Sequence, residues 1–195
     1  MFRRFFILAG ICFVLAACAS KPHNLPQETI QSLGISEIDV NLDKAFISWG
    51  PEEERISRQP RHSPEPRTDA EVQAMVVTKL QKIIHDEYSR VMKSAFRGPR
   101  QARMTINVRT MSVPSLAKRV FIDNVARFTT DITITDIKTG ELLARDDKVY
   151  EHRQMLGGVL APLTDAVGLV GSDPAVEIIQ SQAYSVRKWL SQVGN

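Results

Sequence analysis

The chain has 195 residues, enough for one domain and rarely for two. Its 43% hydrophobic and 24% charged residues are typical of a chain that buries a core, and they exclude a wholly disordered, collagen-like or multi-span membrane protein. Two cysteines are too few for a disulfide scaffold or a four-cysteine zinc site. The net charge of +3 would favour a nucleic-acid partner only if it survived removal of a targeting segment.

Residues 1–17 have the layout of a secretory signal peptide, with two early arginines and then an uncharged apolar run that is too short to span a bilayer. The run ends in Leu15-Ala16-Ala17-Cys18, which resembles the lipobox of bacterial lipoproteins. The resemblance implies cleavage before Cys18 and lipid attachment to its thiol, and two or three acyl chains would make the anchor stable. The alternative is an ordinary signal peptide followed by an accidental cysteine.

Such processing would remove Cys12 and block Cys18, leaving no free thiol and no possible disulfide. It would also lower the net charge to +1, because two of the 25 basic residues leave with the signal. We therefore expect a bacterial cell-envelope protein that meets the membrane through its N-terminal lipid, and no nucleic-acid partner. Because Ala19 replaces the aspartate typical of inner-membrane retention, the resemblance implies the periplasmic face of the outer membrane.

Residues 18–35 are polar and contain two prolines, which predicts a lipidated flexible tether. Extended at about 3.3 Å per residue, the sixteen residues 19–34 of such a tether would reach roughly 50 Å. Residues 36–195 are then expected to form a single domain. Its first strand is predicted at 38–42, where apolar and polar residues alternate, and the apolar stretch continues to Trp49 before Gly50-Pro51 ends it.

An Asp39-x-Asn41-x-Asp43 pattern in this strand resembles the first half of a calcium loop. Lys44 stands where the loop needs its turn glycine, and Gly50 stands where it needs a bidentate glutamate. We therefore interpret the acidic residues as a solvated strand face and expect no metal and no cofactor.

The segment 51–67 contains four prolines, four arginines and four glutamates, with Ile56 as its only aliphatic residue. It cannot bury enough apolar surface to order itself, so we predict a mobile loop. An exposed insertion and a docking arm for a partner are both open readings of it.

A long amphipathic helix is predicted next. Thr68 and Glu71 form a capping box, and Gly98-Pro99 supplies the stop signal. An apolar stripe with steps of three and four runs between them, formed by Val72, Met75, Val76, Leu80, Ile83, Ile84, Tyr88, Val91, Met92 and Ala95.

Three further strands follow from alternating residues. We predict them at 104–113, at 127–135 and at 141–150, with a hairpin turn at 136–140 in which Gly140 takes the left-handed position. Residues 115–125 are ambiguous, and a short strand is allowed at 119–122.

The segment 155–171 is apolar and glycine-rich, with Asp165 as its only charge. It is too short and too broken to cross a membrane, which leaves two readings: a loop tucked over the sheet, or a segment that contacts lipid or a partner. A closing helix is predicted from Asp173 as N-cap and Pro174 as first residue, with its apolar stripe packed on the sheet.

The predicted order is β-α-β-β-β-α. The crossover helix favours a parallel pair between the first two strands, and the hairpin adds an antiparallel part. The expected fold is therefore α+β, a two-layer sandwich with a mixed sheet of four or five strands and two helices on one face.

No catalytic motif is found in the sequence. His85, Asp86 and Glu87 are adjacent on a helix and point in different directions, and His152 has no partner nearby in sequence. Asp146 and Asp147 alternate across a strand, so they cannot form a carboxylate pair on one face. A further cluster of basic residues near the end of the long helix is favoured by the helix dipole, and consists of Arg97, Arg100 and Arg103.

The element order over 36–193 resembles that of small envelope lipoproteins with a curli-secretion-channel-like or penicillin-binding-protein-activator-like α/β domain. It is also similar to alphaproteobacterial lipoproteins of uncharacterised function. The resemblance carries over no functional residues, and the alternating hairpins that a pore would need are not present.

Three functional hypotheses follow. The first is a noncatalytic envelope lipoprotein that binds another envelope protein, in a partner-binding or assembly-accessory role. The second is a lipoprotein that binds lipid or another apolar small molecule, with 155–171 as a lid over an apolar cavity. The third is a hydrolase with dispersed catalytic residues, which would require a cleft that brings His85 or His152 near a carboxylate or hydroxyl.

Overall fold

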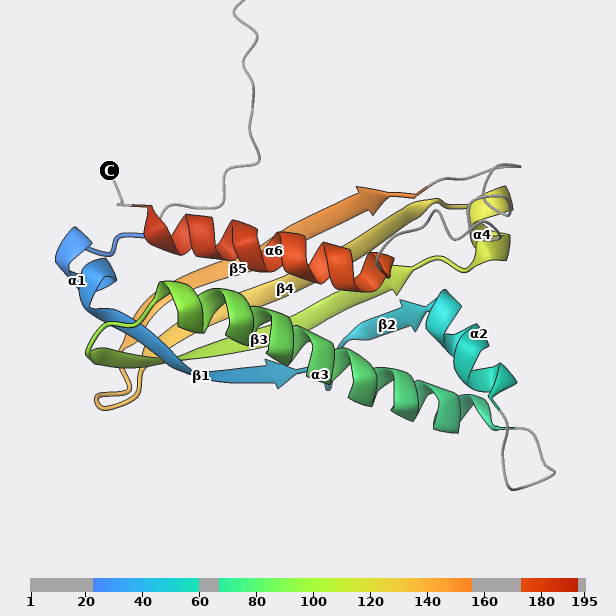
Figure 1. Ribbon diagram of the computed structural model, residues 1–195, viewed down its shortest axis with the longest axis horizontal. Helices are drawn as coiled ribbons and strands as arrows, with labels where there is room; N and C mark the ends of the chain where they lie inside the picture. Colours follow the sequence, from blue (N-terminus) through green and yellow to red (C-terminus); the bar gives the residue numbers. More distant parts are fainter. Residues whose placement is uncertain (1–22, 60–66, 156–172, 193–195) are drawn as a thin grey trace, which may run out of the picture.

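A computed structural model describes residues 23–59, 67–155 and 173–192. These residues form one mixed sheet covered on one face by two long helices, as Figure 1 shows. The prediction of an α+β two-layer sandwich is confirmed.

The sheet is built around its long central strands. β3 (Arg100–Val113) pairs antiparallel with β4 (Val125–Asp136), which pairs antiparallel with β5 (Leu142–Gln154). On its other edge β3 pairs in parallel with β1 (Leu33–Asn41) and then with β2 (Phe46–Trp49), which lie one after the other along it. The predicted parallel pair flanking the long helix is therefore present.

A change of phase in β3 explains why its apolar pattern is irregular. In the first part of β3 the even-numbered residues face the helices, namely Met104, Ile106 and Val108. In the last part the odd-numbered Met111 and Val113 face them. The register with β4 shifts between Val108 and Thr110, so the extra residue moves the inward positions from even to odd numbers.

The two long helices pack side by side on the sheet (Figure 1). The predicted capping box begins α3 (Asp69–Ala95), since the Thr68 hydroxyl accepts from the Glu71 N–H and the Glu71 carboxylate accepts from the Thr68 N–H. α6 (Pro174–Ser191) begins at the predicted cap, where Asp173 accepts from the Ala175 N–H at 2.9 Å.

A fully buried glutamine joins both helices to the sheet. The Gln182 amide oxygen accepts from the hydroxyls of Tyr88 (2.7 Å) and Thr130 (3.0 Å). Its amide nitrogen donates to the carbonyls of Phe128 (3.2 Å) and Val149 (3.0 Å) on neighbouring strands. Thr130 and Val149 lie at a register shift between β4 and β5, so Gln182 satisfies polar groups at an irregular part of the ladder.

Three local predictions are wrong. The predicted tether contains α1 (Gln27–Ser32) and the start of β1, because Leu25, Leu33 and Ile35 are buried in the core. The predicted mobile loop begins with α2 (Gly50–Arg58), in which a proline stands in the first turn, where its missing N–H costs nothing.

Where the sequence allows a short strand at 119–122, residues 119–121 are instead in α4 (Leu116–Phe121), which is capped by the Ser115 hydroxyl. Residues 60–66 of the predicted loop lie outside the described residues. So do residues 156–172, which include nearly all of the apolar segment 155–171. Met155, at the end of the described part, is buried.

Candidate functional site

The predicted lipid-attachment residue Cys18 lies outside the described residues, but the point where the chain enters the fold is well defined. His23 is buried, and its ring packs edge-on against Trp189 with centroids 5.2 Å apart. Its Nε2 lies 3.0 Å from the Trp189 carbonyl, and its Nδ1 lies 3.3 Å from the Leu25 N–H. The tautomer with the proton on Nε2 satisfies both contacts.

The ends of several helices and strands lie together at one end of the domain, where His23 packs on Trp189 (Figure 1). The Gly98 N–H donates to the Leu33 carbonyl at 2.9 Å, and the Ile137 N–H donates to the Gln101 carbonyl at 3.0 Å. These contacts bring together the C-terminal ends of α3 and α6, the segment 23–34 and the β4–β5 hairpin. We call this region the N-terminal end of the domain, and it comprises residues 23–34, 93–101, 136–142 and 184–192.

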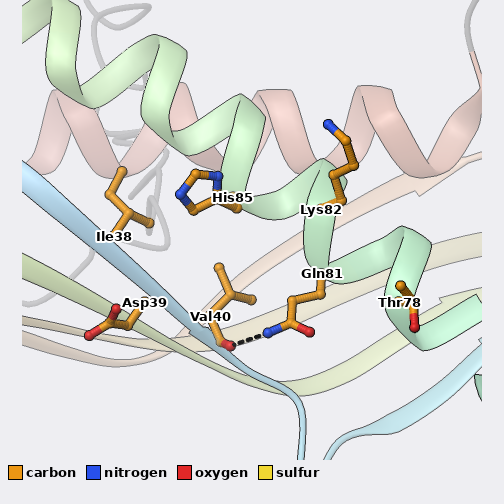
Figure 2. A pocket seen from close by; sticks show the side chains of 7 residues that line it. All are labelled: Ile38, Asp39, Val40, Thr78, Gln81, Lys82 and His85. Carbon is orange, nitrogen blue, oxygen red and sulfur yellow. Dashed lines mark hydrogen bonds between the residues drawn. The ribbon is translucent and has the colours of Figure 1, made fainter.

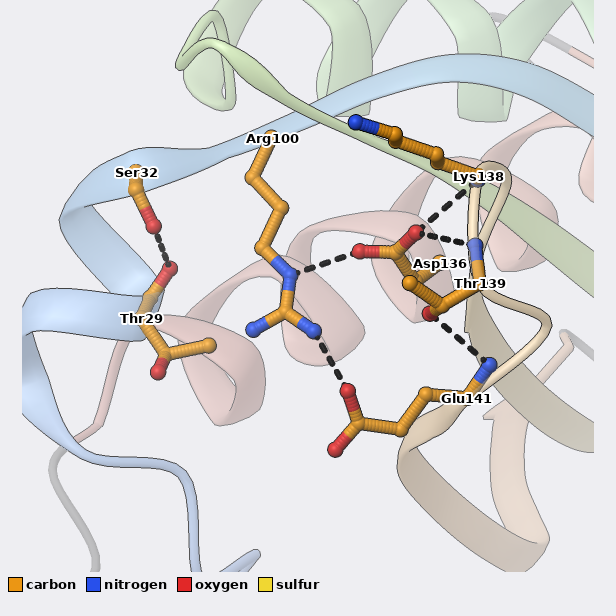
Figure 3. A network of polar contacts seen from close by, with 7 residues as sticks. All are labelled: Thr29, Ser32, Arg100, Asp136, Lys138, Thr139 and Glu141. Atoms are coloured by element: carbon orange, nitrogen blue, oxygen red, sulfur yellow. Dashed lines mark hydrogen bonds and ion pairs between the residues drawn. The ribbon is translucent and has the colours of Figure 1, made fainter.

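An ion-pair network stabilises the hairpin at this end (Figure 3). Arg100 Nε donates to Asp136 at 2.7 Å, and its Nη2 donates to Glu141 at 2.7 Å. Asp136 also accepts from the backbone N–H groups of Lys138 and Thr139, both at 2.9 Å. The bond from Arg100, followed by that from Thr139, lowers the pKa of Asp136 to about 2. Gly140 has a φ of +74°, which confirms the predicted turn.

The cluster of arginines predicted near the end of α3 is divided by the fold. Arg100 belongs to the hairpin network, and Arg97 is exposed. Arg103 points to the other face of the sheet, where it pairs with Glu37 and Asp39. These arginines therefore do not form one anion-binding surface.

An open groove runs between β1 and α3 (Figure 2). Its volume is about 430 Å³, and its lining residues are Ile38, Asp39, Val40, Thr78, Gln81, Lys82 and His85. Across the groove the Gln81 amide donates to the Val40 carbonyl at 3.1 Å, which satisfies one acceptor on the outer edge of β1.

The groove contains His85, one of the two histidines considered for a hydrolase, beside a carboxylate. His85 Nδ1 lies 3.3 Å from the carboxylate of Asp86, and both side chains are about half exposed. The Thr78 hydroxyl in the same groove donates to the Ala74 carbonyl at 2.9 Å. The pair is therefore a solvated helix-surface contact with no nucleophile beside it among the described residues.

A second polar centre lies on the face of the sheet that the helices leave uncovered. Asp131 of β4 accepts from Arg109 Nε at 2.7 Å and from the Lys148 N–H at 2.9 Å. Arg109 and Lys148 lie at the register shifts of β3 and β5, and Lys148 has a φ of +63°. Burial raises the pKa of Asp131, but the bonds from Arg109 and Lys148 outweigh it, so the net pKa is lowered.

Sequence reasoning missed this centre because a shift in register leaves no local motif. A hollow of about 500 Å³ lies beside it, lined by Asn41, Asp43, Lys44, Asn107, Val108, Arg109 and Asp131. Bulges are enriched next to functional sites, and here two of them place a carboxylate and a guanidinium on an exposed surface. The arrangement can hold a polar partner group, and its ion pair is already satisfied internally.

Sequence reasoning also missed a buried charge cluster where α2 packs on α3. Glu52 is 4% exposed and accepts from Arg55 at 2.7 Å and from Lys79 at 2.8 Å. Burial raises the pKa of Glu52, but the bonds from these two cations outweigh it and lower the pKa overall. Lys79 also lies 4.9 Å from the centre of the buried Trp49 ring. The two cations therefore pair the buried Glu52 carboxylate, which fits a structural role.

The remaining predicted residues do not assemble into a site. His152 stacks on Tyr150 at the far end of β5, with ring centroids 5.4 Å apart. Asp146 is buried and Asp147 is exposed in an ion pair with Arg145, so the two carboxylates point to opposite faces as predicted. Among the described residues no three His, Cys, Asp or Glu side chains lie close enough to hold a metal ion.

The acidic pattern read as half a calcium loop has other partners. Asp39 pairs with Arg103, and the Asn41 side chain accepts from the Asp43 N–H at 2.9 Å in a local turn. Within the described ranges, no helix has the length and apolar character needed to cross a membrane.

No protein-family model matches the chain, and neither does any curated protein. Three solved structures show a distant likeness. A candidate lipoprotein from Caulobacter crescentus is 11% identical over 58% of this chain and 81% of its own, with a TM-score of 0.37. A PelC dodecamer from Paraburkholderia phytofirmans is 9% identical over 80% and 90%, with a TM-score of 0.35.

A DUF330 protein from Xanthomonas campestris is 10% identical over 82% of this chain and 84% of its own, with a TM-score of 0.34. Likeness at this level carries no argument about function. The functional proposal therefore depends on the chain's own residues.

Proposed function

We propose that this chain is a lipid-anchored bacterial envelope protein that acts by binding another envelope protein and not by catalysis. The observation that carries the proposal is the sequence Leu15-Ala16-Ala17-Cys18, which ends five residues before the buried His23. A buried His23 gives the domain a fixed attachment to the anchored segment. The outer membrane, at its periplasmic face, is the proposed location.

Replacement of the predicted lipid-bearing cysteine tests the anchor. Cys18→Ser should move the protein from the membrane fraction to the soluble fraction and abolish incorporation of a labelled fatty acid. Cys12→Ser is the matched control, since this cysteine lies inside the predicted signal peptide and its loss should change neither readout. A Cys18→Ser protein that stays in the membrane fraction would overturn the lipoprotein proposal.

The uncovered face of the sheet is the proposed partner-binding surface. It presents short polar side chains and ion pairs, among them Thr105, Thr133 and the Arg109–Asp131 pair, and no described helix covers it. A surface of this composition suits a polar, wet protein interface more than a bilayer or an apolar ligand.

Site-specific photocrosslinking in intact cells tests the partner-binding role. A crosslinking residue at Thr133, on the uncovered face, should give a discrete product of higher mass. The same residue at Ser185, exposed on α6, should not, because α6 covers the opposite face. No product from Thr133 and its neighbour Thr105 would argue against partner binding through this face.

A further inference from the structure

We infer that the N-terminal end of the domain docks directly on an anionic phospholipid surface. This inference rests on the proposed lipid anchor and adds what the anchor does to the orientation of the domain. The domain would stand on its N-terminal end, with its strands directed away from the bilayer.

The link between the anchor and the fold is short. Five residue steps separate Cys18 from the buried His23, and at 3.3–3.6 Å per step they span at most about 18 Å. A lipid on Cys18 therefore holds the N-terminal end of the domain close to the headgroups. A flexible tether that extended to residue 35 would not have held the domain close to the headgroups.

This end of the domain is positively charged. It has six basic residues and three acidic ones, the acidic ones being Glu28, Asp136 and Glu141. Taking these from the 23 basic and 22 acidic residues that follow the signal peptide leaves 17 basic and 19 acidic residues elsewhere. The positive charge of the mature chain is thus concentrated at the end that the anchor brings to the membrane.

Most of these cations are available to a ligand. Arg100 is engaged by Asp136 and Glu141. The other five are exposed and have no ion pair among the described residues; they are Lys93, Arg97, Lys138, Arg187 and Lys188. The dipoles of α3 and α6 explain Lys93 and Lys188, which lie in the last turns. They do not explain Lys138, which lies in the hairpin turn.

Two exposed apolar side chains complete the surface. Ile137 is 40% exposed and Leu142 is 55% exposed, and they flank the hairpin turn that carries Lys138. Apolar side chains beside lysines are the combination that anionic bilayers attract, since the charges meet headgroups and the apolar groups enter the interface. The chemistry and the short link together favour phospholipid over an acidic protein as the occupant.

A fluorescent probe at each end of the domain tests the orientation. The lipidated protein is reconstituted on vesicles of phosphatidylcholine with 30% phosphatidylglycerol, or of phosphatidylcholine alone, with brominated acyl chains as quenchers. Ile137→Cys carries the probe at the N-terminal end, and Lys118→Cys on α4 carries it at the opposite end. We expect quenching at 137 at least threefold stronger than at 118 on the anionic vesicles at 50 mM salt.

Salt and charge reversal separate docking from anchoring. At 500 mM salt the difference between the probes should disappear, because exposed charges are screened, while the lipidated protein should still float with the vesicles. Lys93→Glu with Lys188→Glu should remove the quenching at 137, whereas Lys44→Glu with Lys118→Glu should not. Equal quenching at both positions in low salt would overturn the docking, and failure to float in high salt would overturn the anchor.

Discussion

The two faces of the sheet use similar residues to different effect, and two Arg–Asp pairs that join β3 to β4 show how. Asp136 ends the row of β4 residues that face the helices, and its side chain is 7% exposed beside Arg100. Asp131 lies on the uncovered face, where its side chain is 16% exposed and its partner Arg109 is 46% exposed. Both aspartates accept an arginine Nε at 2.7 Å and at least one backbone N–H.

The difference teaches which face determines the fold. Polar groups on the covered face are enclosed, so losing a partner leaves a donor or acceptor that water cannot reach. Charges on the uncovered face keep their water, so their pairs add little to the free energy of unfolding and their identities are open to change. The uncovered face is therefore the one on which a binding function can vary without harm to the core.

The largest expected effect tests the covered face. Gln182→Leu keeps the side-chain size but leaves the hydroxyls of Tyr88 and Thr130 and two strand carbonyls without their partner. Burial raises the pKa of Tyr88, so this phenol remains a donor in need of an acceptor. We expect the free energy of unfolding to fall by about 3 kcal/mol in urea denaturation.

Ser185→Ala, exposed on the same helix, is the control for this prediction and should change the free energy by less than about 0.5 kcal/mol. A Gln182→Leu protein as stable as the control would show that the four contacts are not enclosed. The two faces would then differ less than the burial of their side chains suggests.

A pH series tests the ion pair between Arg100 and Asp136. The pKa of Asp136 is about 2 in the folded protein, below the value of about 3.9 expected in the unfolded chain. Asp136 therefore contributes stability that is fully present above about pH 4 and is lost as the pH falls toward 2. Asp136→Asn keeps an acceptor for the turn N–H groups, and it removes the charge together with the oxygen that accepts from Arg100.

The measurement is the difference in urea midpoint between the wild-type and Asp136→Asn proteins from pH 2 to pH 7. The wild type should be the more stable at pH 7, and the difference should shrink to nearly nothing at pH 2. A difference that does not change with pH would show that Arg100 does not favour the charged carboxylate. Subtracting the variant removes the contribution of the other carboxylates, which titrate in both proteins.

These contrasts also mark how far the sequence could predict the fold. The capping box at Thr68, the Asp173-Pro174 start and the turn at Gly140 are local signals, and each element that they predict is present. α2 was missed because Glu52 can be buried only next to Lys79, which is 27 residues further along the chain. Contacts of that range leave no trace in local composition.

The same limit applies to the candidate sites. The helical position of His85 and the opposed carboxylates at 146 and 147 follow from periodicity, and the structure agrees with both. The Asp131 centre depends on two register shifts, and the docking of His23 depends on Trp189 at the other end of the chain. Lipid attachment at Cys18 stays a prediction from the motif alone.

The uncovered face should tolerate loss of its own ion pair. Arg109→Met keeps much of the side-chain length and removes the charge that faces Asp131. Because Arg109 is nearly half exposed, we expect the free energy of unfolding to fall by less than about 1 kcal/mol, with a smaller loss at high salt. A loss comparable to that of Gln182→Leu would mean that the uncovered face also determines the fold.

The smallest expected effect concerns the backbone of the same centre. Lys148 has a φ of +63°, a conformation that is unfavourable for residues with a side chain and open to glycine. Lys148→Ala removes the side chain and keeps the strain, so it is the reference for Lys148→Gly.

In an ordinary strand, glycine is the less stable of the two by about 0.5–1 kcal/mol, because its unfolded chain is more flexible. At position 148 we expect the order to reverse, with the glycine variant equal to or up to about 1 kcal/mol more stable in urea denaturation. If Lys148→Gly is instead less stable than Lys148→Ala, the register shift does not hold residue 148 in the left-handed region. The backbone conformation would then not explain why the Lys148 N–H donates to Asp131.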